Sequence, residues 1–262
     1  MHPALWISKT GLDAQQTNIS VISNNVANAS SIGFKKSRGV FEDLLYQTVS
    51  QPGGISAAGN KLPNGVNLGS GTKVVATQKL FTQGNMVTTA NSMDLMIEGD
   101  GFFEVQLPDG RAAYSRNGQF SMDELGQVVT SGSGYLLQPV IIIPSDATSV
   151  TISETGEVSV KTLDAVENQV VGQISIVDFI NPAGLSPMGQ NLYLETGVSG
   201  IPIEGVASLD GMGAIRQGAL ETSNVNVTEE LVNLIESQRI YEMNSKVISA
   251  VDQMLAYVNQ NL

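Results

Sequence analysis

Apolar residues recur at intervals of seven near both ends of the chain. The first repeat lies within residues 4–29 and comprises Leu5, Leu12, Ile19 and Val26. The second comprises Val227, Leu234, Tyr241, Ile248, Leu255 and Leu262, with Leu231 widening the stripe. A seven-residue period keeps one side of a helix facing another helix, because about 3.5 residues then complete a turn. We therefore predict a helix at each end and expect the two apolar seams to pair.

The polar residues refine these two helices. Asn226 is a good N-cap for the second helix, with Glu229 placed three residues on as in a capping box and Glu230 adding to the first-turn acidity. The polar positions of the first helix are mostly amides and hydroxyls with little charge. A lone helix of this kind is marginal in water, so we expect both helices to depend on packing partners.

The pattern between the helices changes to a period of two, which is typical of strands. The clearest such segments are residues 102–107, 126–130, 135–143 and 170–179. Turn pairs such as Asn117-Gly118 and Asp210-Gly211 separate the segments. An all-β region over about 80–220 is therefore predicted, since no helical pattern intervenes.

Residues 50–72 contain too few apolar side chains to hold a core, which predicts a long extended loop. The fold class is thus α+β and multidomain. We expect the N- and C-terminal helices to pair in an inner coiled-coil-like domain (residues 1–37 and 222–262). An inserted extended loop or hairpin (38–75) and an all-β outer region (76–221) complete the predicted organisation.

Charge separates the parts of the chain further. The net charge is −12, but Lys and Arg minus Asp and Glu gives 4 − 1 = +3 over residues 1–41 and 4 − 17 = −13 over 91–221. A middle region with this negative charge repels the phosphate backbone, which argues against nucleic acid as a partner. The chain has no run approaching the ~18 apolar residues of a membrane span, so we expect no direct membrane insertion. The first residues lack the pattern of a cleaved signal peptide.

Few residues offer catalytic or metal chemistry. There is no cysteine, and His2 is the single histidine. Thiolate and clustered histidine metal sites are therefore excluded, and the scattered carboxylates mark no catalytic pair. Lys35, Lys36 and Arg38 form a basic cluster too small for a nucleic-acid surface, so we expect acidic neighbours or a helix C-terminus beside it. We predict no catalytic residue, no metal, no cofactor and no enzymatic activity.

Several longer motifs carry a specific resemblance. Asn24-Asn25-Val26-Ala27-Asn28 followed by Gly33-Phe34-Lys35 resembles the N-terminal signature of bacterial flagellar rod and hook proteins. Residues 94–105, which include Gly99, Gly101, Phe102 and Phe103, are similar to the central β motif of that family, and residues 114–120 to its next hairpin. Residues 221–227 and 238–246 resemble its C-terminal helix. Together these blocks span nearly the whole chain.

A further stretch resembles the insertion that distal-rod members of the family carry and proximal ones lack. It covers residues 41–63, and its marker positions are Phe41, Leu44, Tyr46, Gln51, Pro52, Gly53 and Pro63. The resemblance implies that this loop braces neighbouring subunits and stiffens the rod. It also implies that the seven-spaced seam residues serve self-assembly.

The resemblance implies a structural subunit that polymerises into a hollow, rigid rod and transmits torque from motor to hook. Its expected partners are further copies of itself, proximal rod and hook subunits at the ends, and the peptidoglycan and outer-membrane ring proteins around it. The expected location is the periplasm-spanning basal body, reached by flagellar type III export without a cleaved signal. Two alternatives stay open: a hook or proximal rod subunit, and a β-rich module that binds or hydrolyses peptidoglycan.

Overall fold

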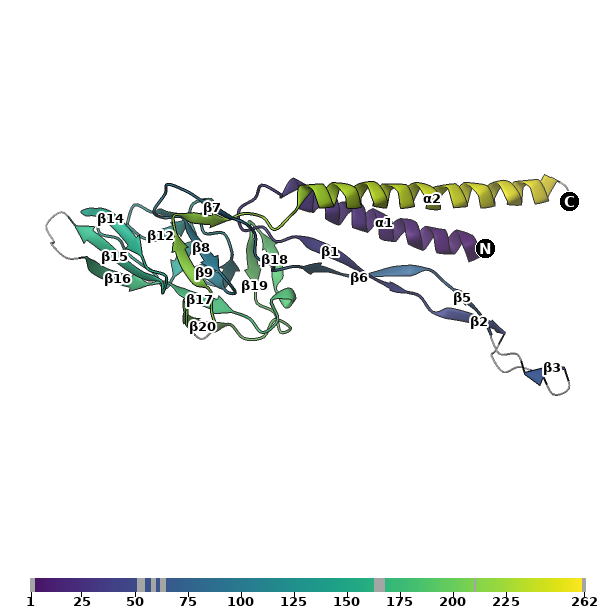
Figure 1. The fold of residues 1–262 in the computed structure, drawn as a ribbon, viewed down its shortest axis with the longest axis horizontal. Coiled ribbons are helices and arrows are strands. Elements are labelled where there is room, and N and C mark those ends of the chain that lie inside the picture. Colours follow the sequence, from purple (N-terminus) through teal and green to yellow (C-terminus); the bar gives the residue numbers. More distant parts are fainter. Residues whose placement is uncertain are drawn as a thin grey trace. The chain divides into compact units, whose positions relative to one another are not determined.

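The computed structural model describes residues 3–50, 55–57, 60–61, 65–162, 168–209 and 211–260. His2, Leu262 and the marker positions Gln51, Pro52, Gly53 and Pro63 lie outside the described residues. Two helices and many strands confirm the predicted α+β class (Figure 1). The chain divides into two compact units. We call Met1–Ala27, Ser37–Gln78 and Asn226–Leu262 the helix unit, and Asn28–Lys36 with Lys79–Val225 the β unit.

The two predicted terminal helices are present and pack against each other in the helix unit. Helix α1 spans Pro3–Ala27 and α2 spans Val227–Gln260. They run antiparallel, so the start of α1 lies beside the later turns of α2 (Figure 1). The Asn226 side-chain oxygen accepts a hydrogen bond from the Thr228 backbone nitrogen at 3.1 Å, which confirms the predicted N-cap.

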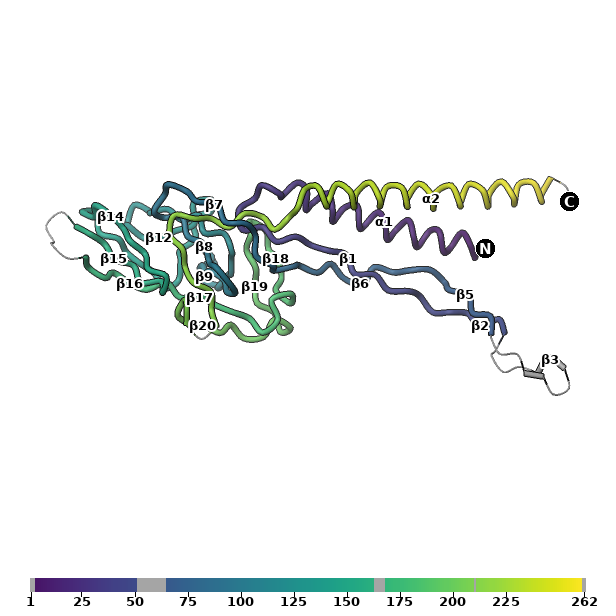
Figure 2. Tube along the Cα trace, in the orientation of Figure 1, coloured from purple at the N-terminus to yellow at the C-terminus, as the bar shows by residue number. Residues whose placement is uncertain are grey.

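A β arm follows α1 and the segment 28–36 in the sequence, and its coloured strands can be followed in Figure 2. It consists of three two-stranded ribbons: β1 (Ser37–Asp43) with β6 (Thr72–Lys79), β2 (Tyr46–Ser50) with β5 (Val66–Gly69), and β3 (Ile55–Ala57) with β4 (Asn60–Lys61). The prediction of an extended loop over 50–72 was therefore wrong in detail. Strands pair through backbone hydrogen bonds, so a segment with few apolar side chains can still form a ribbon.

The β unit contains a nine-stranded sheet, a three-stranded sheet and two strand pairs. The large sheet is built from β9 (Phe102–Gln106), β10 (Ala112–Ser115), β11 (Phe120–Met122), β12 (Val128–Thr130), β13 (Leu136–Gln138), β17 (Ser175–Asp178), β18 (Ser186–Gly189), β19 (Leu192–Leu194) and β20 (Ile203–Val206). The three-stranded sheet contains β14 (Ala147–Ile152), β15 (Glu157–Thr162) and β16 (Gln169–Gln173). The pairs are β8 (Leu95–Glu98) with β21 (Ala214–Gln217), and β7 (Met86–Thr88) with β22 (Ala219–Glu221).

Two predicted strands differ from the structure. Segment 135–143 forms the short β13 and, at Ile142, an isolated bridge to Gln127, because Pro139 between them has no backbone N–H to continue the ladder. Segment 170–179 forms two strands in two different sheets, β16 and β17. A period of two cannot distinguish these outcomes, since both strands alternate in the same way.

The core of the β unit has two parts, on opposite faces of β9. Successive strand residues point to opposite faces. Phe103 accordingly enters the main cluster with Val105, Leu137 and Ile176. Phe102 enters a smaller cluster, in which its ring meets the ring of Phe179 edge-on at a centroid distance of 5.9 Å. The family-motif pair Phe102-Phe103 thus anchors both clusters.

Candidate functional site: the terminal helices and the motif cluster

The two helices meet through polar side chains. The Asn18 side-chain nitrogen donates to the Ser237 hydroxyl at 2.9 Å, and the Asn25 side-chain nitrogen donates to a Glu230 carboxylate oxygen at 3.2 Å. These contacts lie seven residues apart on both helices, as an antiparallel register requires. Asn25, Glu230 and Ser237 are all buried.

A third contact continues the series by one more step of seven. Gly11 faces Asn244 so closely that a Cβ built on the glycine would lie 3.0 Å from the Asn244 side-chain nitrogen. We call Gly11, Asn18 and Asn25 with Asn244, Ser237 and Glu230 the polar ladder. Hydrogen bonds with fixed partners specify a register more narrowly than an apolar seam does. The apolar period did not predict these polar contacts, although Gly11, Asn18 and Asn25 have the same seven-residue spacing in the sequence.

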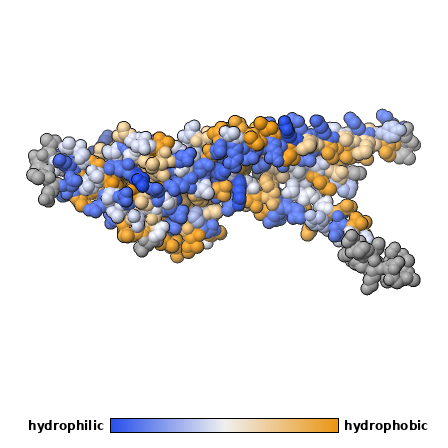
Figure 3. Space-filling view, viewed as in Figure 1, coloured by the Kyte–Doolittle hydropathy of each residue, from blue (hydrophilic) through white to orange (hydrophobic). Residues whose placement is uncertain are grey.

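The apolar seam residues lie beside the polar ladder and are only partly covered. The half-buried ones are Leu5, Leu12, Ile19, Val26, Leu234 and Ile248. The exposed ones are Val227, Leu231, Tyr241 and Leu255. Further apolar side chains of α2, including Val232, Ile235, Met243 and Val247, are exposed too, and Figure 3 shows hydrophobic residues interspersed with polar ones along this helix. An exposed apolar surface of this kind is typical of a protein that binds partners.

The β arm is attached to α1 at two points. Near its base, the Asn25 side chain donates to the Ser37 carbonyl at 2.8 Å and accepts from the Ser37 backbone nitrogen at 2.9 Å. Farther along, the Thr72 backbone nitrogen donates to the Thr10 hydroxyl at 3.3 Å. Among the marker positions of the arm, Phe41 and Tyr46 are exposed and Leu44 is half-buried. The family-motif residue Asn25 therefore joins α1 to both α2 and the arm, whereas Asn24 is exposed.

The other family-motif residues gather inside the β unit around a buried ion pair. The Lys35 ammonium lies 2.6 Å from a Glu221 carboxylate oxygen, and both side chains are almost completely buried. Lys35 also donates to the Thr82 carbonyl at 2.9 Å, and the Gly84 backbone nitrogen donates to the same Glu221 oxygen at 2.7 Å. Lys35 of the N-terminal motif and residues of the segment 79–84 thus meet at the carboxylate of Glu221, which belongs to the C-terminal motif. The prediction of an acidic neighbour for the basic cluster is confirmed for Lys35.

A second buried cation faces the same carboxylate. The Arg116 guanidinium lies 3.6 Å from the other Glu221 oxygen and 5.2 Å from the centre of the Phe102 ring. Burial lowers the pKa of Lys35, although the Glu221 carboxylate opposes this shift. Burial also lowers the pKa of Arg116. We call Lys35, Glu221 and Arg116 the motif cluster.

Backbone bonds close the chain around the motif cluster. The Gly33 nitrogen donates to the Glu221 carbonyl at 2.8 Å, and Gly33 has a positive φ of 69°. A Cβ at this position would lie 2.6 Å from the Asn117 backbone nitrogen, so only glycine fits. The Asn224 side chain accepts from the Lys36 nitrogen at 2.7 Å and donates to the Leu80 carbonyl at 2.9 Å. Phe34 is buried, and Asn28 accepts a side-chain bond from Ser31 at 3.2 Å.

Two buried tyrosines should make the free energy of unfolding of the β unit depend on pH under alkaline conditions. Burial raises the pKa of both Tyr114 and Tyr193 from 10.0 to about 12. Between these values the unfolded state binds fewer protons than the folded state, so the free energy of unfolding should fall as the pH rises from 10 towards about 12. Tyr193→Phe should remove part of this dependence and one late-titrating group from the near-ultraviolet phenolate absorbance. Tyr135→Phe is the control, and an equal change in both variants would contradict the assignment.

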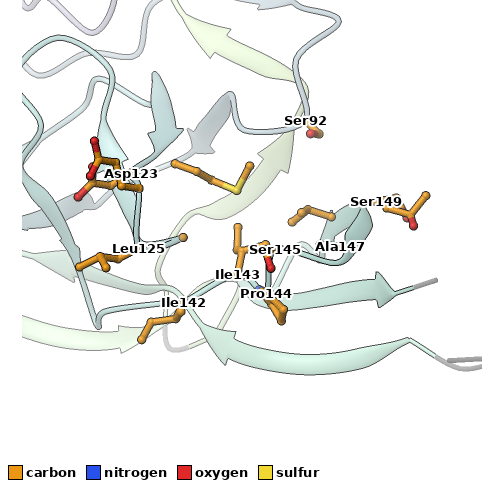
Figure 4. Close-up of a pocket in the computed structure, with 14 residues that line it drawn as sticks. Ser92, Asp123, Leu125, Ile142, Ile143, Pro144, Ser145, Ala147 and Ser149 are labelled. Atoms are coloured by element: carbon orange, nitrogen blue, oxygen red, sulfur yellow. The ribbon is translucent and has the colours of Figure 1, made fainter. Parts of the chain in front are cut away.

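One surface groove of the β unit is lined by apolar, hydroxyl and acidic side chains. It has a volume of about 580 Å³ and lies between the Asp123–Gly126 turn and the segment from Ile142 to Val150 (Figure 4). The labelled side chains Leu125, Ile142 and Pro144 are apolar, and Asp123 supplies charge at the rim. In the described part of the chain, no three His, Asp or Glu side chains gather where they could hold a metal ion. Neither described helix is long and apolar enough to cross a membrane.

Comparisons with known proteins agree with the motif resemblance. The family model described as flagella basal body rod protein matches residues 6–35. The model for the flagellar hook protein FlgE/F/G D1 domain matches residues 96–160. The flagellar basal body rod FlgEFG protein C-terminal model matches residues 216–261. These matches include the whole polar ladder and all three residues of the motif cluster.

Full-length relatives give the same answer. The flagellar basal-body rod protein FlgG of Buchnera aphidicola from Acyrthosiphon pisum is 52% identical over 99% of this chain and all of its own length. FlgG of Borreliella burgdorferi is 48% identical, with 99% of this chain and 98% of the relative covered. FlgG of Bacillus subtilis is 38% identical, with 97% of each chain covered. The resemblance stated from the motifs is confirmed, and the chain belongs to the FlgG family of flagellar basal-body rod proteins.

Proposed function

We propose that the chain is a structural subunit of the flagellar distal rod, which self-assembles through its terminal helices into a rigid, hollow, helical shaft that transmits torque from motor to hook. The observation that supports this proposal is the exposure of α2. In the described part of one chain, α1 is the one helix packed against α2, and Ile235, Met243 and Leu255 stay exposed. Such a surface is costly in water unless further copies cover it.

Assembly into a filament requires only that one contact repeat without closing. A contact between two different faces of the same subunit generates an open helical polymer. We propose that the seam residues on α1 and α2 supply such faces, and that the paired helices form the inner, coiled-coil-like layer. The boundaries 1–37 with 222–262, 38–75 and 76–221 remain our proposal for the inner domain, the arm and the outer β region.

We propose that the β arm stiffens the rod by bracing neighbouring subunits. Its attachment to α1 through Ser37 and Thr72 gives it a defined start, and its exposed Phe41 and Tyr46 offer contact area. A two-stranded ribbon alone is marginal in water, so the arm gains stability where other chains cover it. We assign the same role to Gln51, Pro52, Gly53 and Pro63.

The remaining elements of the proposal concern partners and route. Proximal rod and hook subunits would bind the ends of the shaft, and the peptidoglycan and outer-membrane ring proteins would surround it. The subunit would reach the basal body by type III export. The relatives are named as rod proteins and indicate no enzymatic family, so we propose no catalytic role and no cofactor.

Polymerisation of the purified chain tests this function. The full-length protein should form filaments in electron micrographs, with isolated rod fragments as seeds if nucleation is slow. Ile235→Asp should abolish them, because it places a charge on the exposed apolar surface of α2. Gly132→Asp is the matched control, since a Cβ at Gly132 meets nothing within 4 Å. A wild-type chain that stays monomeric with seeds present would overturn the proposal.

A further inference from the structure

A polar cleft lies on the helix unit where α1, α2 and the start of β1 meet. It has a volume of about 280 Å³, and its lining includes Asn18, Asn25, Glu230, Glu236 and Ser237. Most of these side chains belong to the polar ladder, and two carry negative charge. We call this surface the acidic cleft.

Glu230 is buried in the acidic cleft without a cation. Only 5% of its surface is exposed, and its hydrogen-bond partner is the neutral amide of Asn25. Among the described residues no Lys or Arg nitrogen lies within 4.0 Å of its carboxylate. Arg38 also lines the cleft, but its guanidinium donates to Gln78. The first turn of α2 offsets part of the cost of this charge, yet a buried carboxylate is normally paired with a cation.

A second buried polar group without a partner lines another part of the acidic cleft. The side-chain oxygen of Gln15 is buried and accepts no hydrogen bond, and Gln15 also lines the cleft. A buried acceptor left without a donor costs free energy. Because Gln15 lies ten residues, about 15 Å, before Asn25 along α1, a cation entering the cleft could pair with Glu230 or donate to Gln15 but not both, and Glu236 would add attraction at the rim.

The opposite side of α2 carries cations of this kind. At about 100° per residue, Arg239 lies about 180° and Lys246 about 160° around α2 from Glu230. The strip of α2 that lies about 140° to 220° around the helix axis from Glu230 contains both cations and no Asp or Glu. Val232, Ile235 and Met243 on this strip are exposed. We call it the basic strip.

We propose that the acidic cleft of one copy receives Arg239 or Lys246 from the basic strip of a second copy. The inference rests on the proposed self-assembly and names the faces that make one contact. A subunit cannot satisfy its own cleft in this way, because the basic strip faces away from it on the same helix. Because the two faces differ, a pair of copies joined in this way still has one free acidic cleft and one free basic strip. Further copies can therefore add at both ends. Charge complementarity also disfavours the alternative in which two clefts or two strips meet.

Mixing two charge-reversed variants tests the contact in the full-length chain. Glu230→Lys should lose assembly because its cleft repels the basic strip, and the Arg239→Glu, Lys246→Glu double variant should lose it because its strip repels the cleft. A mixture of the two should regain sedimentable polymer, since each variant then meets a complementary face on the other. Lys161→Glu on the β unit is the control and should assemble normally. Circular dichroism of each variant checks that the helices are retained.

The absence of cysteine from the sequence allows a second measurement. Asn233 lines the acidic cleft, and Asn233 and Lys246 are 13 residues apart, which places them about 20 Å apart along α2 and beyond the reach of a disulfide. An Asn233→Cys, Lys246→Cys variant should therefore give a ladder of cross-linked multimers on oxidation, whereas each single variant should give at most dimers. If the wild-type chain polymerises and both charge-reversed variants also assemble, the proposed contact is wrong. It is also wrong if the wild-type chain polymerises but the double-cysteine variant gives no series of cross-linked multimers. A wild-type chain that never polymerises would instead overturn the proposed function.

Discussion

Glu221→Gln should lower the free energy of unfolding of the β unit by about 3–5 kcal/mol, because it leaves two buried cations without their carboxylate. Glutamine keeps the size of the side chain, so the change isolates the charge. Lys35 lies 2.6 Å and Arg116 3.6 Å from the Glu221 carboxylate. Urea unfolding of the full chain, followed by hydrogen exchange in peptides of the β unit, measures the loss. Glu157→Gln, at an exposed position in β15, should stay within about 0.5 kcal/mol of wild type.

The pH dependence of this variant distinguishes charge from packing. Burial already lowers the pKa of Lys35, and without Glu221 that pKa should fall further. The unfolded state would then bind more protons than the folded state below the ordinary lysine pKa, so the free energy of unfolding of the variant should rise with pH between neutrality and about pH 10. A loss of stability that is small, or that does not vary with pH, would contradict the motif cluster as a charge-balanced unit.

Gly101→Ala should cost about 2–5 kcal/mol, as the sum of two effects. Gly101 has a φ of 128°, and an alanine there adds about 1–2 kcal/mol of backbone strain. Its Cβ would lie 2.1 Å from a methyl carbon of Ile176, and relieving such overpacking costs about 1–3 kcal/mol. Ile176 is fully buried and pairs with Phe103 across β17 and β9, so it has little freedom to move.

Gly110 provides a matched control for this substitution. Its φ of 84° is also positive, but a Cβ there would meet nothing within 4 Å. Gly110→Ala should therefore show only the strain of about 1–2 kcal/mol. Thermal and urea unfolding of both variants separate the cost of backbone strain from the cost of overpacking against Ile176. Equal losses would show that the space beside Ile176 is not what requires glycine in this family motif.

Several features were readable from local pattern because their cause is local. The helices follow from the seven-residue apolar period, and Asn226 caps α2 because an N-cap needs only neighbouring backbone nitrogens. The family motifs identified the chain, and the relatives confirmed it. The shortened β13 and the paired arm were not predicted. Whether an alternating or apolar-poor segment pairs, and with which strand, depends on partners distant in sequence.

By itself, the sequence determined the two terminal helices, the β-rich middle and the family. Periodicity and turn chemistry act over a few residues, so they are visible in one dimension. Only the tertiary structure decided that the helices meet through Asn18, Asn25, Ser237 and Glu230 rather than through the apolar seam alone. It also decided that Lys35 meets a glutamate 186 positions away. Polar contacts of this kind depend on which side chains the packed backbone brings within hydrogen-bond distance, and no local pattern contains that distance.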